Sequence, residues 1–386
     1  MPSGRGKKVV LAMSGGVDSS VAATLLRDDG YEVVGCFMRL GSDRDNEIEY
    51  DNLKEACEPE VGKIRIGKQG CCSVNDASDA RLVAAMLDIP FYVLNFKADF
   101  GRIIDYFVDE YQAGRTPNPC VRCNDWLKFG KLHDYARSID ADYVASGHYA
   151  RIERHAGNSR LLRGLDHHKD QSYVLFGASQ ERREQMLLPV GGLTKDETRQ
   201  IAEQAKLPVF NKPDSQEICF VPDNDYARLV TRRSEPGQVS PGPILDTDGN
   251  TLGEHPGQQH FTIGQRRGLN LALGYPIYVV DKDAQTNAVT VGTREHLLAE
   301  GAVASQVTWH EPTLPRDWLP CQVKVRYNSE PVAARVRAGV DGEKPVIKVR
   351  FERPVDAVTP GQALVCYHDE MVLGGGWIDR ALQASD

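Results

Sequence analysis

The stretch from Ser14 to Ser20, which reads SGGVDSS, constrains the fold of this chain more than any other feature. It follows the apolar run 9–13 and precedes apolar residues at helical spacing over 21–26, so the sequence predicts a strand, a glycine loop and a helix. Gly15 and Gly16 let the backbone approach a ligand closely. The start of the helix favours an anion, and a phosphate is the expected guest. The stretch matches neither GxxxxGK[ST] nor GxGxxG, and two glycines alone would fit an ordinary turn equally well.

Length and composition describe a globular chain with several domains. The 386 residues suggest two or three domains, and 41% hydrophobic with 26% charged residues argues against disorder. No apolar run approaches the ~18–20 residues that span a bilayer, so no membrane partner is expected. The short basic start lacks the apolar segment of a signal peptide, which predicts a cytoplasmic protein. A net charge of −8 argues against indiscriminate nucleic-acid binding but allows local basic surfaces.

The pattern of expected strands, helices and turns changes twice along the chain, which predicts three domains. Residues 1–210 alternate strands and helices, as expected for an α/β domain with a parallel sheet. Residues 211–300 are rich in turns and predict a small, mixed or β central domain, and residues 301–386 predict a C-terminal β-barrel. The expected strands are 31–38, 91–96, 142–146, 277–281, 288–291, 322–327, 332–337, 346–351 and 363–367, and the expected helices are 76–87, 99–111, 126–132 and 194–206. Thr194 and Glu197 predict a capping box at the start of the last helix, and strands 277–281 and 288–291 predict a hairpin. A long polar loop is expected over 41–70.

Several chemistry-bearing residues fall where predicted parallel strands end. The glycine loop, Met38, Asn95 and the Ser-Gly-His of 146–148 all follow or close such strands. Ligands of parallel sheets bind at the carboxyl ends of the strands, so these residues are expected to share one edge of the sheet.

The chain has nine cysteines, and two of them form a Cys-x-x-Cys pair at Cys120 and Cys123. Two prolines before the pair predict a rigid loop, and Cys123 is expected near the N-terminus of helix 126–132. There the helix dipole, with Arg122 beside it, would lower the pKa of the thiol. Cys219 lies in an expected interdomain loop.

Three interpretations of these three cysteines fit the sequence. They could bind a metal or an iron–sulfur cluster, form a sulfur-transfer pair with a resolving thiol, or be ordinary thiols. Structural zinc needs four ligands, and there is no second Cys-x-x-Cys. Cys36, Cys321 and Cys366 lie in strand-like runs and are expected to fill the core.

A set of ordered motifs gives the chain a family resemblance. SGGVDSS resembles the signature of the PP-loop ATP pyrophosphatases, whose fold is adenine nucleotide α-hydrolase-like. Together with it, the chain contains in order GRTPNPCVRCN, SGHYAR, LLRGLDHHKDQSY, DSQEICF, TIGQRRGL, VRYNS and VTPGQALVCY. Over residues 7–380 this set resembles the bacterial and organellar tRNA-specific 2-thiouridylase family.

The resemblance implies an ATP-dependent 2-thiolation of the wobble uridine, with tRNA bound through its anticodon stem-loop. ATP, with Mg²⁺, would adenylate the uracil C2 oxygen, and the base must be flipped to reach buried thiols. Residues implied in ATP binding are Ala12, Met13, Ser14, Gly15, Gly16, Val17, Asp18, Ser19, Met38 and Gly147. Residues implied in contacts to the target uridine or elsewhere in the tRNA are Asn118, Pro119, Cys120, His148, Lys169, Asp170, Gln171, Arg326, Tyr327 and Gln362.

The resemblance also implies roles for the thiols. Cys219 would carry a persulfide, supplied by a sulfur relay that a cysteine desulfurase feeds, and Cys123 would release the sulfur by forming a disulfide. Many members have Asp where this chain has Cys120. A four-iron four-sulfur cluster on Cys120, Cys123 and Cys219 is therefore a second route, and both stay open. The extra pair Cys71-Cys72 has no assigned role.

Two other functions remain as alternatives. Another PP-loop adenylating enzyme, a ligase or amidotransferase, would use an amine and would not need the thiols. A non-catalytic tRNA-binding or metal-storage protein would not need the phosphate loop. RNA-stimulated release of pyrophosphate from ATP would exclude the second of these.

Overall fold

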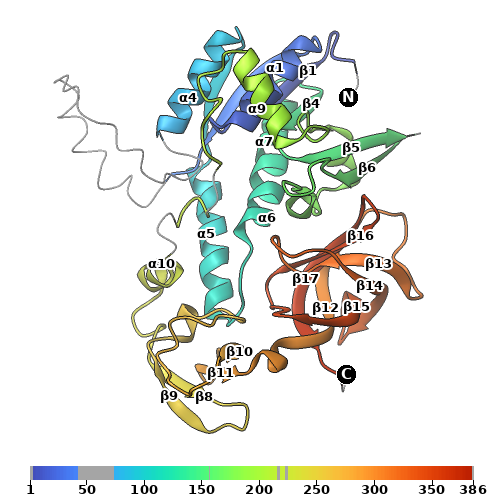
Figure 1. The fold of residues 1–386 in the computed structure, drawn as a ribbon. Coiled ribbons are helices and arrows are strands. Elements are labelled where there is room, and N and C mark those ends of the chain that lie inside the picture. The colour runs from blue at the N-terminus through green and yellow to red at the C-terminus, as the bar shows by residue number, and fades with distance from the viewer. Residues whose placement is uncertain (1–2, 42–73, 156, 215–217, 222–224, 385–386) are drawn as a thin grey trace, which may run out of the picture. The chain divides into compact units, whose positions relative to one another are not determined.

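The computed structural model describes residues 3–41, 74–155, 157–214, 218–221 and 225–384. It divides into two compact units, each built from several chain segments (Figure 1). Unit 1 comprises residues 1–102, 130–148 and 187–225, and unit 2 comprises 103–129, 149–186 and 226–386. The division into three domains at 210 and 300 remains a prediction.

Unit 1 contains the predicted parallel sheet. Its strands are β1 (Lys8–Ala12), β2 (Glu32–Arg39), β3 (Phe91–Asn95) and β4 (Tyr143–Ser146), in the order β3-β2-β1-β4, with the short β7 (Met186–Leu187) beside β4. β1 pairs in parallel with β2 and β4, and β2 pairs in parallel with β3. Val9, Val10 and Leu11 are fully buried, as expected for a central strand that is covered on both faces. The α/β fold class is confirmed.

The helices of this part follow the predicted alternation. They are α1 (Val17–Asp28), α4 (Val74–Met86), α5 (Lys97–Gln112), α7 (Leu132–Ser138) and α9 (Lys195–Gln204). α1 contacts both α4 and α9, whereas α7 contacts β1 and β4 (Figure 1). α9 begins at the capping box that Thr194 and Glu197 predicted: the backbone N–H of Thr194 donates to Glu197 Oε2 over 2.7 Å.

A closed antiparallel barrel forms much of unit 2. Its strands are β12 (Leu298–Trp309), β13 (Leu319–Lys324), β14 (Val332–Asp341), β15 (Lys344–Asp356), β16 (Ala363–His368) and β17 (Met371–Leu382). They pair in the order β12-β15-β14-β13-β16-β17, and β12 also pairs with β17, which closes the barrel and confirms the C-terminal prediction. The hairpin of β5 (Ala150–His155) and β6 (Asn158–Arg163) joins this sheet at β17, where Met371 pairs with Leu162.

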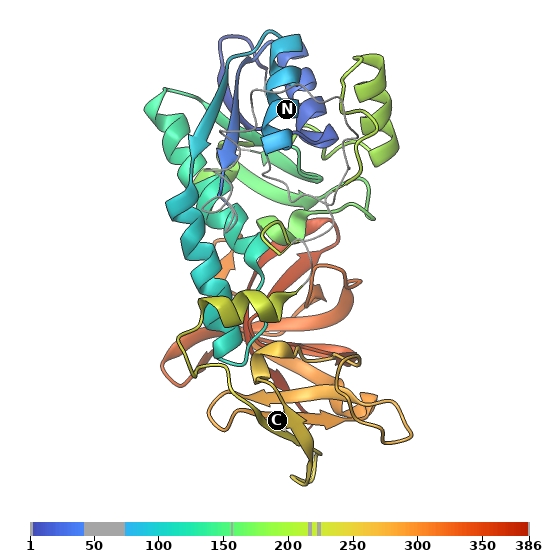
Figure 2. The same cartoon turned by 90° about the vertical axis from the view of Figure 1, so that its left-hand side faces the viewer.

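The central segment forms a small mixed sheet, drawn in yellow to orange in Figure 2. Its strands are β8 (Gly242–Leu245), β9 (Thr251–His255), β10 (Tyr278–Asp283) and β11 (Ala288–Gly292), in the order β10-β11-β8-β9. The predicted hairpin of β10 and β11 is confirmed. The remaining elements are α6 (Pro119–Cys123), α8 (Gln180–Glu184), α10 (Tyr226–Arg233), a π-helix (Asn124–Lys131) and 3₁₀ turns at Ser172–Leu175, Gln258–His260 and Arg294–Leu297.

Some expected elements differ from the structure. The strand predicted over 322–327 ends at Lys324, and a turn follows, in which the N–H of Ser329 donates to the carbonyl of Arg326. The alternation of polar and apolar residues extended past the point where the barrel pairing stops. The loop predicted over 41–70 falls almost wholly outside the described residues, as does the pair Cys71-Cys72. Among the described residues, no helix combines the length and apolar character needed to cross a membrane.

The buried Lys282 of β10 predicts a measurable pH dependence. Burial lowers its pKa to about 7 from 10.5, and its ammonium donates to the carbonyl of Phe261. Between these two pKa values the unfolded chain binds more protons, so stability rises with pH across this window. In wild type, Lys282 should add about 2 kcal/mol to the free energy of unfolding between pH 7.5 and 9.5. Urea unfolding at both pH values should show a smaller gain for Lys282→Met, and an equal gain would contradict the prediction.

Candidate active site

The glycine loop in unit 1 is shaped to leave backbone donors open. Gly15 has φ +72, and a Cβ there would lie 2.2 Å from the carbonyl oxygen of Asp76, so only glycine fits. Gly16 is the N-cap of α1, but no side chain caps this helix. The amide groups of its first turn are therefore available to an anion at the carboxyl end of β1. This geometry suits the phosphate expected from the sequence.

The end of β4 lies against the same loop. A Cβ at Gly147 would lie 2.6 Å from the backbone nitrogen of Ser19, so this glycine allows the two segments to touch. The next residue, His148, is 7% exposed, and its Nδ1 lies 2.6 Å from Ser146 Oγ. Met38 is buried near the end of β2. The structure thus brings Gly147 and Ser19 together, and it places His148 inside unit 1, largely shielded from solvent.

Two lysines at the glycine loop were not found by sequence reasoning. Lys195 Nζ lies 2.7 Å from Asp18 Oδ1, and Lys212 Nζ lies 3.0 Å from the carbonyl oxygen of Gly15. Both lysines are distant from the loop in sequence, and neither belongs to a motif that would have marked it as a site residue. The capping box before Lys195 was visible, but it predicted only where a helix begins.

In unit 2, Cys120 and Cys123 lie on one short helix, α6. Asn118 caps it by accepting from the N–H of Val121, and Pro119 occupies its first position. The π-helix follows Cys123 directly. The helix expected over 126–132, with Cys123 near its N-terminus, instead continues a helical stretch that begins after the cap at Asn118. The dipole acts mainly on the first turn, where Cys120 lies.

The guanidinium of Arg122, which the sequence placed beside the thiols, packs against three aromatic rings. Its guanidinium carbon lies 3.8 Å from the ring centroid of Trp377, 5.1 Å from that of Tyr106 and 5.3 Å from that of Trp126. It also donates to Gln306 Oε1 over 2.8 Å. The guanidinium is held among aromatic rings, and it ties the Cys-x-x-Cys helix to β17 and to Gln306 of β12.

Several predicted tRNA-binding residues surround α6. Gln362 donates to the carbonyls of Thr116 and Pro117, and its Oε1 lies 3.4 Å from Asn118 Nδ2. Tyr173 donates to the carbonyl of Ala363.

Tyr327, another predicted tRNA-binding residue, lies near the same helix. The ring centroid of Tyr327 lies 6.0 Å from that of Tyr173. Burial raises the pKa of Tyr327, and this pKa also responds to the charge of a Cys120 thiolate and to a hydrogen bond with Gln171. The structure therefore gathers Asn118, Cys120, Gln171, Tyr327 and Gln362 in one region of unit 2.

Asp170 is placed differently from its neighbours in the same motif. Its side chain is 1% exposed, and its carboxylate accepts from Arg163 Nε over 3.1 Å, from the N–H of Gly164 over 3.0 Å, and from both N–H and Oγ of Ser172. Ser172 Oγ also lies 3.5 Å from the hydroxyl of Tyr367. A carboxylate with four donors, all from residues 163–172, holds this loop in its conformation.

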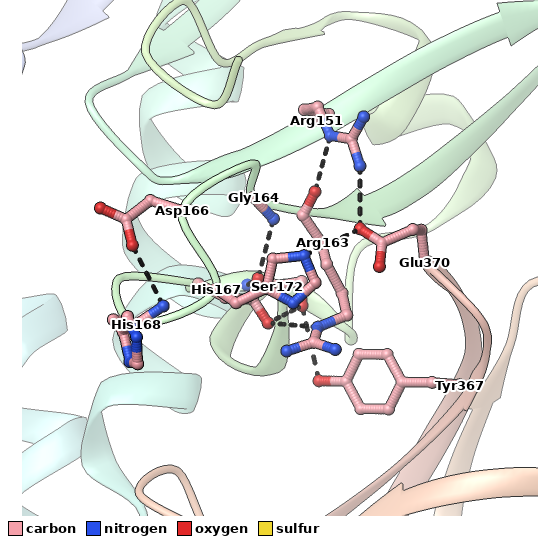
Figure 3. Close-up of polar contacts among 10 residues, drawn as sticks. Arg151, Arg163, Gly164, Asp166, His167, His168, Ser172, Tyr367 and Glu370 are labelled. Carbon is pink, nitrogen blue, oxygen red and sulfur yellow. Dashed lines mark hydrogen bonds and ion pairs between the residues drawn. The ribbon is translucent and has the colours of Figure 1, made fainter. Parts of the chain in front are cut away.

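The loop that Asp170 anchors carries exposed basic groups. His167 and His168 are exposed, and Lys169 is half-buried. Arg151 donates to Glu370 and to the carbonyl of Arg163, as Figure 3 shows. At the other predicted contact, Arg326 is exposed and pairs with Asp356 over 3.3 Å.

The thiols themselves take part in no disulfide among the six cysteines that the structure describes. Cys36 and Cys366 are buried and Cys321 packs partly against the barrel core, as expected of core cysteines. Within the described ranges, no three His, Cys, Asp or Glu side chains lie together in a way that could hold a metal ion. The three cysteines expected to bind an iron–sulfur cluster belong to different units, with Cys219 in unit 1 and Cys120 and Cys123 in unit 2.

Family models match almost the whole chain. Residues 7–223 match the "tRNA methyl transferase HUP domain", residues 234–293 the "tRNA methyl transferase PRC-barrel domain", and residues 299–378 the "Aminomethyltransferase beta-barrel domain".

Curated relatives match at similar length. The chain is 48% identical to a "tRNA-specific 2-thiouridylase MnmA" from Rhodopirellula baltica, covering 97% of both chains, and 49% identical to one from Geobacter metallireducens, covering 97% of this chain and 98% of that one. Among solved structures, the "U34-tRNA thiolase NcsA from Methanococcus maripaludis with its [4Fe-4S] cluster" is 18% identical over 61% of this chain and 69% of that one, with a TM-score of 0.33. That likeness is too low to carry an argument about fold or chemistry.

Proposed function

The chain belongs to the tRNA-specific 2-thiouridylase family, and on that premise we propose that it uses ATP to replace the C2 oxygen of the wobble uridine of tRNA with sulfur. The observation that carries this most is the 48% identity to a curated tRNA-specific 2-thiouridylase, which covers 97% of both chains. The chain is accordingly a tRNA sulfurtransferase. The glycine loop and the Cys-x-x-Cys helix supply the two chemistries that such a reaction needs.

The nucleotide site is the glycine loop of unit 1. Residues 12–19 would hold the ATP phosphates through the uncapped first turn of α1, with Met38 and Gly147 towards the adenine. Mg²⁺ is held in proteins by one or two carboxylates together with substrate phosphates, and Asp18 is the carboxylate on this loop. ATP would transfer its adenylyl group to the C2 oxygen and release pyrophosphate, which makes AMP the leaving group at C2.

The sulfur step uses two thiols. A Cys219 persulfide attacks C2 with its terminal sulfur and expels AMP. The Cys123 thiolate then attacks the Cys219 sulfur, which breaks the S–S bond, leaves the terminal sulfur on the base and forms a Cys123–Cys219 disulfide. A cellular dithiol must reduce this disulfide before the next turnover. We propose a cytoplasmic setting on this ground, with the persulfide supplied by a relay that a cysteine desulfurase feeds.

The tRNA would bind through the region around α6. Asn118, Pro119 and Cys120 would contact the flipped uridine, and Gln171, Tyr327 and Gln362 lie in the same region and would complete the contact. Lys169 and Arg326 would reach the backbone of the anticodon stem-loop. The burial of Asp170 and His148 supports an indirect role for both, in which they position neighbours that touch the tRNA.

The cluster route is kept as an outcome of the test. No step is derived through an iron–sulfur cluster, because its three expected cysteine ligands are divided between the two units. Cys120→Ser separates the two routes, since a persulfide pair does not need this thiol and a three-cysteine cluster does.

The decisive experiment is thiolation of an anticodon stem-loop after anaerobic purification. 2-Thiouridine would be measured by mass spectrometry with ATP and a sulfide or persulfide donor, beside iron and acid-labile sulfide analysis. Wild type and Cys120→Ser should form 2-thiouridine, whereas Cys123→Ser and Cys219→Ser should form none. Bound iron lost together with activity in all three variants would replace the persulfide route by the cluster. A wild type that thiolates nothing would overturn the proposed function.

A further inference from the structure

Two lysines, the buried Lys195 and the partly buried Lys212, contact the glycine loop from chain segments outside it. Lys195 is the first residue of α9, and Lys212 follows that helix. The ammonium of Lys195 lies 2.7 Å from Asp18 Oδ1 and 2.7 Å from Asp214 Oδ1. Asp18 is the acidic residue of the SGGVDSS stretch itself.

The two lysines differ in what they hold. Lys212 Nζ donates to the carbonyl of Gly15 over 3.0 Å, to Asp76 over 2.7 Å and to Asp79 over 2.6 Å. These three acceptors use all three ammonium protons and tie the loop to α4. Lys212 therefore holds Gly15 in place.

Lys195 is instead bound to a carboxylate that faces solvent. The Asp18 side chain is 31% exposed, whereas the Lys195 side chain is 10% exposed. A ligand that reaches the loop from solvent would therefore contact Asp18 before it contacts Lys195. The capping box of Thr194 and Glu197 fixes the start of α9, and the ammonium of Lys195, the first residue of that helix, is a cation placed at the glycine loop.

We propose that Lys195 is a phosphate-binding residue of the nucleotide site, and that its ion pair with Asp18 is exchanged when nucleotide binds. This inference rests on the proposed use of ATP. The ammonium would leave the Asp18 carboxylate for the β- or γ-phosphate, and Asp18 would be released to the metal ion that accompanies the phosphates. Asp214 keeps Lys195 in place during the exchange. Lys212 is a positioning residue that holds the loop open.

The proposed exchange explains why Lys195 and Asp18 form an ion pair before nucleotide binds. A lysine that is 10% exposed is costly to leave without a counter-charge, and Asp18 supplies one. Within the described residues, no group of side chains could hold a metal ion without further ligands, so a metal at Asp18 would depend on the phosphates. When the ion pair breaks, the phosphate would become the new partner of Lys195, and the metal ion would become the new partner of Asp18.

Equilibrium binding of Mg²⁺ with a non-hydrolysable ATP analogue, and of AMP, tests the proposal. Lys195→Ala should weaken binding of the ATP analogue about 10- to 100-fold, since it removes a hydrogen bond to a charged group. AMP has no β- or γ-phosphate, so its binding should change much less. Lys195→Arg, which keeps the charge, should restore part of the affinity for the analogue.

Matched variants separate this role from a structural one. Arg199→Gln removes a cation on the same helix that pairs with the same Asp214, and it should leave both affinities unchanged. Lys212→Met should weaken both ligands together and lower the melting temperature, because it releases Gly15. Equal weakening of AMP and the ATP analogue in Lys195→Ala would overturn the proposal. Normal binding in that variant would overturn it too, and would leave the proposed function standing if wild type still thiolates tRNA.

Discussion

Replacing Asp170 with alanine is expected to destabilise unit 2 by about 3–5 kcal/mol and to abolish thiolation of tRNA. The carboxylate is 1% exposed, and its partner Arg163 is 11% exposed, so the variant leaves a buried guanidinium without its counter-charge. The N–H groups of Gly164 and Ser172 lose their acceptor as well. The loop that presents His167, His168 and Lys169 would then no longer be held. Urea unfolding and a stem-loop thiolation assay would measure the two effects.

The neighbouring Lys169 supplies the control. Lys169→Ala should weaken tRNA binding while leaving the free energy of unfolding within about 0.5 kcal/mol of wild type, as is usual for substitutions away from the core. In the double variant Asp170→Ala/Arg163→Met, part of the lost stability should return, because the unpaired buried charge is gone. A stable and active Asp170→Ala would mean that the loop is held by other contacts.

Replacing Arg122 with methionine is expected to slow sulfur transfer about 10- to 100-fold while ATP binding stays near that of wild type. The guanidinium lies among three aromatic rings and donates to Gln306, so it fixes α6, the helix that carries Cys120 and Cys123. Displacement of a reacting group by about 1 Å can cost about 100-fold in rate. Arg122→Lys should recover little, since an ammonium cannot stack as a planar guanidinium does. The thiolation rate and the affinity for ATP, measured side by side, would show this split.

Gln306 provides the matched control for Arg122. Gln306→Ala removes only the hydrogen bond and leaves the aromatic stack, so it should slow thiolation far less than Arg122→Met. If both variants lose the same activity, the hydrogen bond and not the stack would hold the helix. If Arg122→Met loses ATP binding in parallel with thiolation, a general loss of folding would explain the result better than a displaced helix.

Much of the fold could be predicted because its signals are local. The alternation of strands and helices predicted the parallel sheet, and the spacing of short strands predicted the barrel. The capping box at Thr194 and the hairpin of β10 and β11 were also correct. The helix start at Asn118 was missed because Pro117 and Pro119 on either side of it suggested an extended loop, although an Asn followed by Pro is also a pattern for a helix start.

The amino-acid sequence by itself determined the glycine loop, the α/β and β-barrel classes and the set of candidate residues, because each depends on neighbours along the chain. Tertiary structure alone decided what several of those residues do. Asp170 is buried among donors from residues 163–172, and Arg122 packs against Tyr106, Trp126 and the distant Trp377, which belong to three different elements. Lys195 meets Asp18 across 177 residues of sequence. Such long-range ion pairs and stacks leave no periodic trace in the sequence, because the chain must fold before the partners meet.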